Sequence, residues 1–198
     1  MCIPYTIHCI DEAGTAQFVS AMAKGIRTFF LEKTPPLRPF IYPALHLNLF
    51  GDLGAGKTTA VRFLLKELGY RGKVKSPTYS LCEEHRLTLI SDCASHPNSQ
   101  QQTVDLFHFD FYRMQSPNEW LDAGLKEHFT HTDRRTICIV EWPEKAENTL
   151  PTMDIDITIA HASEPQNERA RTIDLRANTK VGEQLIAHPK VYLPHFQS

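Results

Sequence analysis

The stretch GDLGAGKTT, residues Gly51 to Thr59, decides the fold of this 198-residue chain. It matches the P-loop pattern of a glycine, four further residues, a second glycine, a lysine and a serine or threonine. Glycines let such a loop bend tightly, so that its amide N–H groups and the positive end of the next helix converge on phosphate oxygens. The residues expected to contact a nucleotide are Gly51, Asp52, Leu53, Gly54, Ala55, Gly56, Lys57, Thr58 and Thr59.

Two side chains of this loop carry the expected chemistry. Lys57 supplies a mobile cation for the β and γ phosphates of ATP, and Thr58 supplies a hydroxyl for Mg²⁺. The flanking sequence supports this interpretation, because the mostly apolar run at 44–50 predicts a buried parallel strand before the loop and a helix is expected from Lys57 to Gly69. The alternative interpretation is a glycine-rich turn followed by a surface lysine.

The rest of the pattern predicts an α/β protein of the P-loop NTPase type, with a mostly parallel central sheet flanked by helices and a C-terminal antiparallel hairpin. Helices are expected over 11–27 and after an N-cap at Ser116, and strands over 81–85, 104–112, 136–140, 154–159 and 171–176. We expect a single domain over 1–198, with a proline-rich loop at 34–43, an inserted surface loop at 87–102, and a weakly patterned tail at 177–198 with a short helix near Glu183.

Composition narrows the function classes. The formal charge of −2 provides no global basic field for DNA or RNA, so any link to tRNA is local or indirect. No run approaches the roughly 18 apolar residues of a membrane helix and no targeting segment is recognised, so we expect a cytoplasmic protein without membrane contact. Five cysteines without CxxC spacing argue against disulfides and structural zinc, and His128 with His131 lack companion ligands, which favours packing roles.

Two carboxylates at predicted strand ends are candidates for the metal side of the site. Glu141 follows the apolar run ICIV, where the carboxyl edge of an open α/β sheet meets its ligand crevice. Asp110 lies in HFDFYR among apolar neighbours, where an unpaired buried carboxylate is costly and a cation-paired one is favoured. The expected magnesium ligands are therefore Thr58, Asp110 and Glu141. The alternative for each acid is a solvated carboxylate at a strand end.

Other polar residues carry weaker signals. Thr78, in the turn SPTY, could close over the γ phosphate as switch loops do, although serine and proline are common in any turn. Arg113 is expected to pair with Asp110, with stabilisation of transition-state charge as the alternative. A group of basic residues is expected to form a solvated face, with an acidic partner or RNA phosphates as the alternative: Arg62, Lys66, Arg71, Lys73 and Lys75.

In order along the chain, GDLGAGKTT, SPTYSL, HFDFYR and VEWPEK resemble the motifs of the bacterial TsaE (YjeE) family, the ATPase component of tRNA threonylcarbamoyladenosine biosynthesis. The resemblance spans residues 11–159 and rests on four ordered motifs, which are far more specific than a P-loop alone. It implies that Trp142 contacts the nucleotide or packs beside it. The positions that match the family's phosphate, magnesium, switch, acidic and nucleotide-adjacent residues are Lys57, Thr58, Thr78, Asp110, and Glu141 with Trp142.

Residues and resemblance together predict a Mg²⁺-dependent ATP hydrolase in which water attacks the γ phosphate in line. The expected catalytic residues are Lys57, Thr78, Asp110 and Glu141. Glu141 is the candidate to orient or deprotonate the water if Asp110 holds Mg²⁺, but the sequence does not separate these duties. The resemblance implies TsaD-like and TsaB-like protein partners, an indirect connection to tRNA, and slow hydrolysis without those partners.

Two other functions stay open at this point. A small-molecule or nucleoside kinase would use Asp110 as a base and Arg113 to bind the acceptor, although the sequence holds no arginine-rich lid segment. A non-catalytic, nucleotide-gated binding module would associate with its partner even without Asp110 and Glu141. A GTPase is disfavoured, because the guanine-reading NKxD pattern is absent from the sequence.

Overall fold

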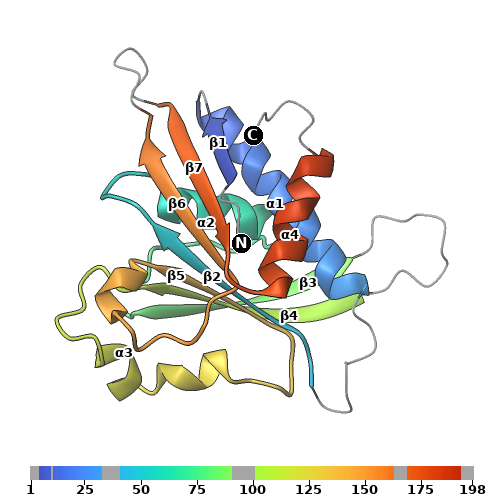
Figure 1. Cartoon of the computed structure of the whole chain (residues 1–198). Coiled ribbons are helices and arrows are strands. Elements are labelled where there is room, and N and C mark those ends of the chain that lie inside the picture. Colours follow the sequence, from blue (N-terminus) through green and yellow to red (C-terminus); the bar gives the residue numbers. More distant parts are fainter. Residues whose placement is uncertain (1–4, 10, 33–40, 91–100, 163–168, 193–198) are drawn as a thin grey trace.

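A seven-stranded sheet with the strand order β1-β7-β6-β2-β5-β4-β3 forms the centre of the computed structural model (Figure 1). The structure describes residues 5–9, 11–32, 41–90, 101–162 and 169–192. The strands are β1 (Tyr5–Cys9), β2 (Ala44–Phe50), β3 (Cys82–Ile90), β4 (Gln101–Asp110), β5 (Thr136–Glu141), β6 (Ile155–His161) and β7 (Arg171–Ala177). The helices are α1 (Glu12–Glu32), α2 (Lys57–Glu67), α3 (Glu119–Asp122) and α4 (Lys180–Tyr192), with the 3₁₀ helices η1 (Leu125–Phe129) and η2 (Pro143–Ala146).

The centre of the sheet is parallel, as the sequence predicts. β2 pairs in parallel with β5 on one side and with β6 on the other, and β4 pairs in parallel with β5. β5 is buried along its whole length, which is typical of a parallel strand covered on both faces. β6 and β7 form the predicted antiparallel hairpin. The predicted fold class is confirmed.

Two apolar layers cover the two faces of the sheet. On one face, α1 and α2 pack against each other and against the strands, and Val61 and Leu65 of α2 are buried there. On the other face, Phe107 and Phe109 of β4 pack with Trp120 of α3 and Phe129 of η1. Because side chains alternate along a strand, β4 contributes to both layers, and its last residues lie between two cores.

The first two helices agree with their sequence patterns. Phe18, Met22 and Ile26 lie on one buried stripe of α1, as their spacing of four residues requires. α2 ends two residues before Gly69, whose φ of 96° and hydrogen bond to the carbonyl of Lys66 give the expected left-handed end. The helix that follows the glycine-rich loop is therefore anchored by its buried face and closed at its far end.

The edges of the sheet differ from the sequence prediction. The sequence pattern does not predict β1, which forms by antiparallel pairing with the distant β7, with Ile7 opposite Ile173. β3 continues to Ile90 and β4 begins at Gln101, so both ends of the segment expected as a loop at 87–102 are strand, because the two strands pair as a hairpin. Residues 91–100 lie outside the described residues, as do 34–40 of the proline-rich loop.

The predicted N-cap at Ser116 is wrong. α3 is only four residues long and begins at Glu119, after Asn118. The carboxylate of Glu119 does reach back, but it accepts a hydrogen bond from the backbone N–H of Gln115 at 2.9 Å. The Glu119 carboxylate is therefore bound to a residue that precedes the helix, and the Ser-Pro motif forms a turn before α3 instead of its N-cap.

The tail forms a longer helix than the sequence predicts. α4 spans 13 residues, and its Leu185 and Ile186 are buried in the core layer shared with α1. Gly182 makes this packing possible, because a Cβ at that position would lie 2.1 Å from the carbonyl oxygen of Asp154. A glycine inside a short helical pattern weakens the local signal, although here it permits close contact with the sheet.

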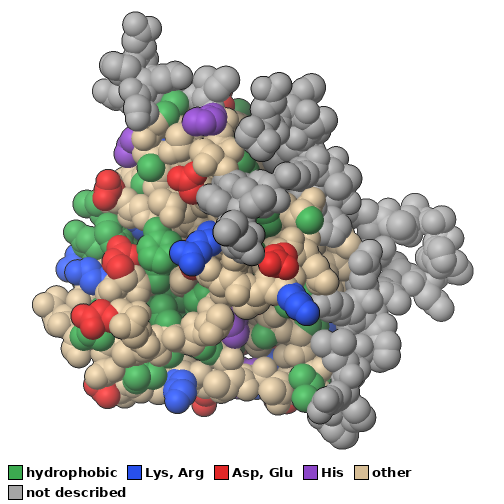
Figure 2. All heavy atoms as spheres, viewed as in Figure 1, with side chains coloured by type: hydrophobic (Ala, Val, Ile, Leu, Met, Phe, Trp, Pro, Cys, Tyr) green, Lys and Arg blue, Asp and Glu red, His purple; other side chains and the backbone are tan. Residues whose placement is uncertain are grey.

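The surface and the histidines agree with the compositional argument. On the face shown in Figure 2, lysines and arginines are interspersed with aspartates and glutamates and do not gather into one basic area. His128 stacks on Phe107 with ring centres 4.2 Å apart, which is the expected packing role. No helix among the described residues is long and apolar enough to cross a membrane.

Candidate active site

A cleft lies where the carboxyl ends of β4 and β5 meet the glycine-rich loop (Gly51–Thr59) and the start of α2. Its volume is about 230 Å³. The cleft is lined by Leu53, Gly54, Gly56, Lys57, Thr58, Thr59, Ser76, Thr78, Asp110, Tyr112, Glu141 and Trp142. The structure thus brings together the four residues predicted to be catalytic, while Gly51, Asp52 and Ala55 belong to the loop without lining the cleft.

Glycine is required in the loop for two different reasons. At Gly51, with φ of 136°, a Cβ would lie 2.1 Å from the carbonyl oxygen of Ile159, so the neighbouring strand β6 excludes any side chain. At Gly54 and Gly56, φ values of 81° and 109° require the left-handed region, and no atom within 4 Å would meet a Cβ. Gly56 precedes α2 and provides no side-chain cap, so the first N–H groups of this helix are left for another acceptor.

Lys57 is held inside the cleft by the loop that carries it. Its Nζ donates hydrogen bonds to the carbonyl oxygens of Gly51 and Asp52, the latter at 3.0 Å, and it lies 3.7 Å from the centre of the Trp142 ring. Burial lowers the pKa of Lys57, and the negative charge of Glu141 is the strongest of the effects that oppose this shift. Among the described residues, Lys57 forms no ion pair with a carboxylate.

The two predicted acids lie side by side at the ends of neighbouring strands. Asp110 of β4 is the register partner of Glu141 of β5, and their exposed fractions are only 3% and 2%. The Oε2 atom of Glu141 accepts a hydrogen bond of 2.9 Å from the hydroxyl of Thr58, and its Oε1 atom lies 2.8 Å from Nε2 of His108. Glu141 therefore links the start of α2 to the interior of the sheet.

Asp110 holds the segment that carries Thr78. Its Oδ2 atom accepts hydrogen bonds of 2.6 Å from the hydroxyls of Ser76 and Thr78, and its Oδ1 atom accepts one of 3.1 Å from the backbone N–H of Tyr112. Because all of these donors are neutral, the charge of Asp110 is stabilised without being cancelled. The turn SPTY is thereby fixed against the cleft, with Thr78 on its lining.

Trp142 forms a wall of the cleft together with Tyr112. Its backbone is left-handed, with φ of 59°, and Pro143 follows it at the start of η2. This uncommon conformation turns the chain directly after Glu141. The indole ring lies 4.9 Å from the ring of Tyr112 and faces the ammonium of Lys57.

The predicted pairing of Arg113 with Asp110 is wrong. No ion pair joins the two among the described residues, and the guanidinium of Arg113 lies 4.5 Å from the ring centre of Tyr79 instead. The reason is that hydroxyl and amide donors already satisfy the Asp110 carboxylate. The basic residues expected to form a solvated face are all exposed: Arg62, Lys66, Arg71, Lys73 and Lys75.

The charges and donor atoms of the cleft fit a magnesium ion bound together with phosphates. Two buried carboxylates face a single ammonium, and their hydrogen-bond donors are hydroxyls, an amide and an imidazole. Within the described residues no cluster of three or more His, Cys, Asp or Glu side chains could hold a metal unaided. Mg²⁺ is commonly bound by one or two carboxylates with substrate phosphates and waters completing its octahedron, so Thr58, Asp110 and Glu141 suit it.

His108 and Ser76 are the site residues that sequence reasoning misses. Both contact a predicted acid directly, Ser76 through its hydroxyl and His108 through its ring. The sequence does hold a signal for His108. It lies two residues before Asp110 on one predicted strand, so the two side chains are expected on the same face of the sheet. For Ser76 the local pattern indicates only a turn.

Fold and cleft together define a class of α/β protein, in which a glycine-rich loop joins a central parallel strand to a helix beside two strand-end carboxylates. The family model described as "Threonylcarbamoyl adenosine biosynthesis protein TsaE" matches residues 11–172. The chain belongs to this TsaE family, as the four motifs predict.

Individual relatives agree with this assignment. A Haemophilus influenzae protein named "tRNA threonylcarbamoyladenosine biosynthesis protein TsaE" is 38% identical over 144 residues, covering 73% of this chain and 77% of the relative. A Bacillus subtilis protein of the same name is 31% identical over 152 residues, covering 77% and 84%. The crystal structure of Bacillus subtilis YdiB superposes with a TM-score of 0.63 at 22% identity, covering 97% of both chains, and shows the same fold.

Proposed function

We propose that this protein is a Mg²⁺-dependent ATPase that supports the threonylcarbamoyladenosine modification of tRNA in the cytoplasm. The observation that carries the proposal is the hydrogen bond between Thr58 and Glu141 in a cleft that also holds Lys57. This bond places a hydroxyl and a carboxylate together at the start of α2, where phosphates and Mg²⁺ would be bound. The relatives named for this biosynthesis supply the tRNA context.

The glycine-rich loop would bind the nucleotide through its backbone. The unsatisfied N–H groups at the start of α2 would donate to phosphate oxygens, and Lys57 would exchange its carbonyl partners for the β and γ phosphates. Thr58, Asp110 and Glu141 would hold Mg²⁺, directly or through water. When bound, Mg²⁺ would neutralise charge on the phosphates. Trp142 would contact the nucleotide or pack beside it.

Hydrolysis would depend on positioning rather than on covalent chemistry. Glu141 is the group that would orient or deprotonate the attacking water, because its carboxylate reaches the cleft while being held from two sides. Thr78, fixed by Asp110, would lie over the γ phosphate and make the segment 76–79 sensitive to its presence. Lys57 would stabilise the negative charge of the transferred group.

Two exposed side chains beside the cleft support the proposal that a protein partner binds there. Leu53 and Tyr79 are exposed by 71% and 85%, although both are large apolar or aromatic residues. Leu53 lines the cleft and Tyr79 directly follows Thr78 of its lining, so a protein bound over the cleft would contact both side chains. We infer that TsaD-like and TsaB-like proteins bind here, that hydrolysis is slow without them, and that tRNA is involved indirectly.

The test combines turnover with its cellular consequence. Phosphate release from Mg²⁺-ATP is measured for the protein alone, with TsaB-like and TsaD-like proteins from the same cell, and with small-molecule acceptors. The proposal predicts release that the protein partners accelerate, and lower threonylcarbamoyladenosine in tRNA, by nucleoside mass spectrometry, when the protein is depleted. Phosphate transfer that depends on an acceptor would support a kinase instead, and an undiminished modification level would contradict the tRNA role.

A further inference from the structure

His108 lies behind the cleft without lining it. It precedes Asp110 by two residues on β4, and its register partner on β5 is Ile139, which precedes Glu141 by two residues. Side chains two residues apart share one face of a sheet, so His108, Asp110 and Glu141 lie on the same face. The exposed fraction of His108 is 0%, and apolar core residues such as Leu106 surround this part of the sheet.

The hydrogen bond to Glu141 determines which ring nitrogen of His108 is the donor. Nε2 lies 2.8 Å from Oε1 of Glu141, and an ionised carboxylate only accepts hydrogen bonds, so the ring must carry its proton on Nε2. Nδ1 is buried and has no hydrogen-bond partner among the described residues. Among the described residues, the bond to Glu141 is therefore the hydrogen bond that holds this ring, with Nε2 as its donor.

This bond also determines which Glu141 oxygen remains for the cleft. Oε1 is occupied by His108, and Oε2 accepts the hydroxyl of Thr58. The Thr58 hydrogen is thereby directed at Glu141, which leaves the lone pairs of its oxygen for another ligand. Without His108, Oε1 would lose its donor, and the Glu141 carboxylate would be less constrained against turning toward the ammonium of Lys57, where its charge opposes the lowering of the Lys57 pKa by burial.

We propose that His108 is a positioning residue for ATP hydrolysis, which donates from Nε2 to Glu141 and thereby fixes both the Glu141 carboxylate and the Thr58 hydroxyl. It touches neither nucleotide nor metal. The inference rests on the proposed ATPase function. Residues that orient the ligands of a metal in this way typically change activity about 10–100-fold when they are replaced.

The test uses two amides that imitate different ring nitrogens. The amide nitrogen of His108→Gln lies near the position of Nε2, and that of His108→Asn lies near the position of Nδ1. We expect His108→Gln to keep kcat within about threefold of wild type, and His108→Asn to lower kcat by about 10–100-fold. The KM for Mg²⁺-ATP should change less than about threefold in both variants, because neither removes a residue proposed to contact the bound nucleotide.

His85 provides the matched control for a purely structural effect. It is also a histidine, 3% exposed, on the neighbouring strand β3, and neither of its ring nitrogens has a hydrogen-bond partner among the described residues. His85→Asn should therefore leave kcat unchanged, whatever it does to the melting temperature. Equal kcat for His108→Asn and wild type would overturn the proposal. Equal losses in His108→Gln and His108→Asn, in proportion to their loss of melting temperature, would overturn it as well.

A measurement on the unaltered chain covers the case in which the variants do not fold. The ¹⁵N chemical shifts of the His108 ring should report a proton on Nε2, and the Nε2 shift should move in Glu141→Gln. A proton on Nδ1 instead would refute the hydrogen bond and the proposal with it. If wild type shows no ATP turnover even with its protein partners, the ATPase function itself fails, and the ring shifts still decide separately whether His108 donates to Glu141.

Discussion

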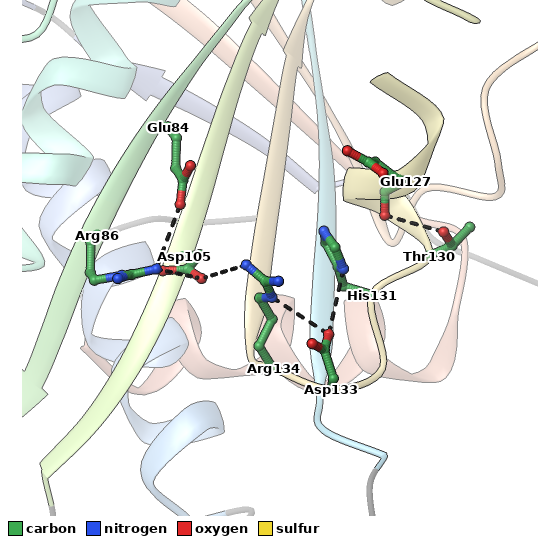
Figure 3. A network of polar contacts seen from close by, with 8 residues as sticks. All are labelled: Glu84, Arg86, Asp105, Glu127, Thr130, His131, Asp133 and Arg134. Carbon is green, nitrogen blue, oxygen red and sulfur yellow. Dashed lines mark hydrogen bonds and ion pairs between the residues drawn. The ribbon is translucent and has the colours of Figure 1, made fainter. Parts of the chain in front are cut away.

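β4 carries two buried aspartates, and their surroundings differ. Asp105, in the middle of the strand, is bound by the guanidinium groups of Arg86 at 2.8 Å and Arg134 at 3.5 Å (Figure 3). Asp110, at the end of the strand, has only neutral donors. Their exposed fractions are nearly equal, 4% and 3%, so burial does not distinguish them. The difference is that the chain itself cancels the charge of Asp105 and leaves that of Asp110 for a ligand.

The network around Asp105 has the features of a structural ion cluster. Arg86 also lies 3.8 Å from Glu84, and Arg134 lies 3.5 Å from Asp133 (Figure 3). The arginine side chains are 66% and 40% exposed, so water screens most of their attraction. Such a cluster stabilises the fold modestly, whereas the uncancelled carboxylates at the ends of β4 and β5 would provide a site for a cation in the proposed function.

The largest effect should come from removing the one ammonium of the cleft. Lys57→Ala should abolish measurable binding of Mg²⁺-ATP, a loss of at least about 100-fold, because the phosphates lose a buried charge partner. Calorimetric titration measures the affinity. Lys66→Ala is the matched control, since Lys66 belongs to the same helix but is exposed, and it should bind like wild type. Unchanged affinity in Lys57→Ala would show that the glycine-rich loop does not bind phosphate.

The comparison of the two aspartates is sharpened by making the same substitution at both. Asp110→Asn should lower kcat at least about tenfold with a small change in melting temperature, because it removes charge from the cleft. Asp105→Asn should leave kcat unchanged and lower the melting temperature by about 3–6 °C, because it breaks the bonds to Arg86 and Arg134. Turnover assays and calorimetric unfolding measure the two properties. The comparison would be broken by loss of kcat in both variants, or in neither.

The smallest effect concerns His85 on β3, whose register partner on β4 is Leu106. Burial lowers the pKa of His85 below its usual 6.5, and the neighbouring His108 lowers it further, while Glu83 opposes the shift. A group with a lowered folded-state pKa contributes stability that is complete above pH 6.5 and is lost as the pH falls toward the folded-state pKa. Melting temperature should therefore fall between about pH 7 and pH 5, and less so in His85→Gln. An equal decrease in both proteins would show that His85 does not contribute.

Most of the central fold could be predicted from the sequence, because its signals are local. The apolar run of β2, the glycines of the loop and the helix expected from Lys57 follow one another in the chain, and the structure confirms them. β1 could not be predicted, since it depends on pairing with β7 at the other end of the chain. The length of α4 could not be predicted either. Gly182 weakens the helical pattern in the sequence, although it is the residue that permits close contact with the backbone of Asp154.

The sequence could predict which main residues belong to the site, but not which hydrogen bonds they form. Asp110 and Glu141 follow from the rule that ligands bind at the carboxyl ends of parallel strands. The partners of these acids could not be predicted, because Arg113 is closer in sequence to Asp110 than Ser76 and still turns away toward Tyr79. Which donor reaches a buried carboxylate depends on the packing of whole strands and turns, and sequence distance does not measure this.

The central claim is that the uncancelled carboxylates and Lys57 together bind a metal–nucleotide pair. Calorimetric titration of ATP with Mg²⁺ and, separately, with the metal removed by chelation tests it most directly, in wild type and in a variant that combines Asp110→Asn with Glu141→Gln. Mg²⁺ should strengthen ATP binding at least about tenfold in wild type, and this gain should disappear in the double variant. Equal affinity with and without Mg²⁺ in wild type would contradict the account.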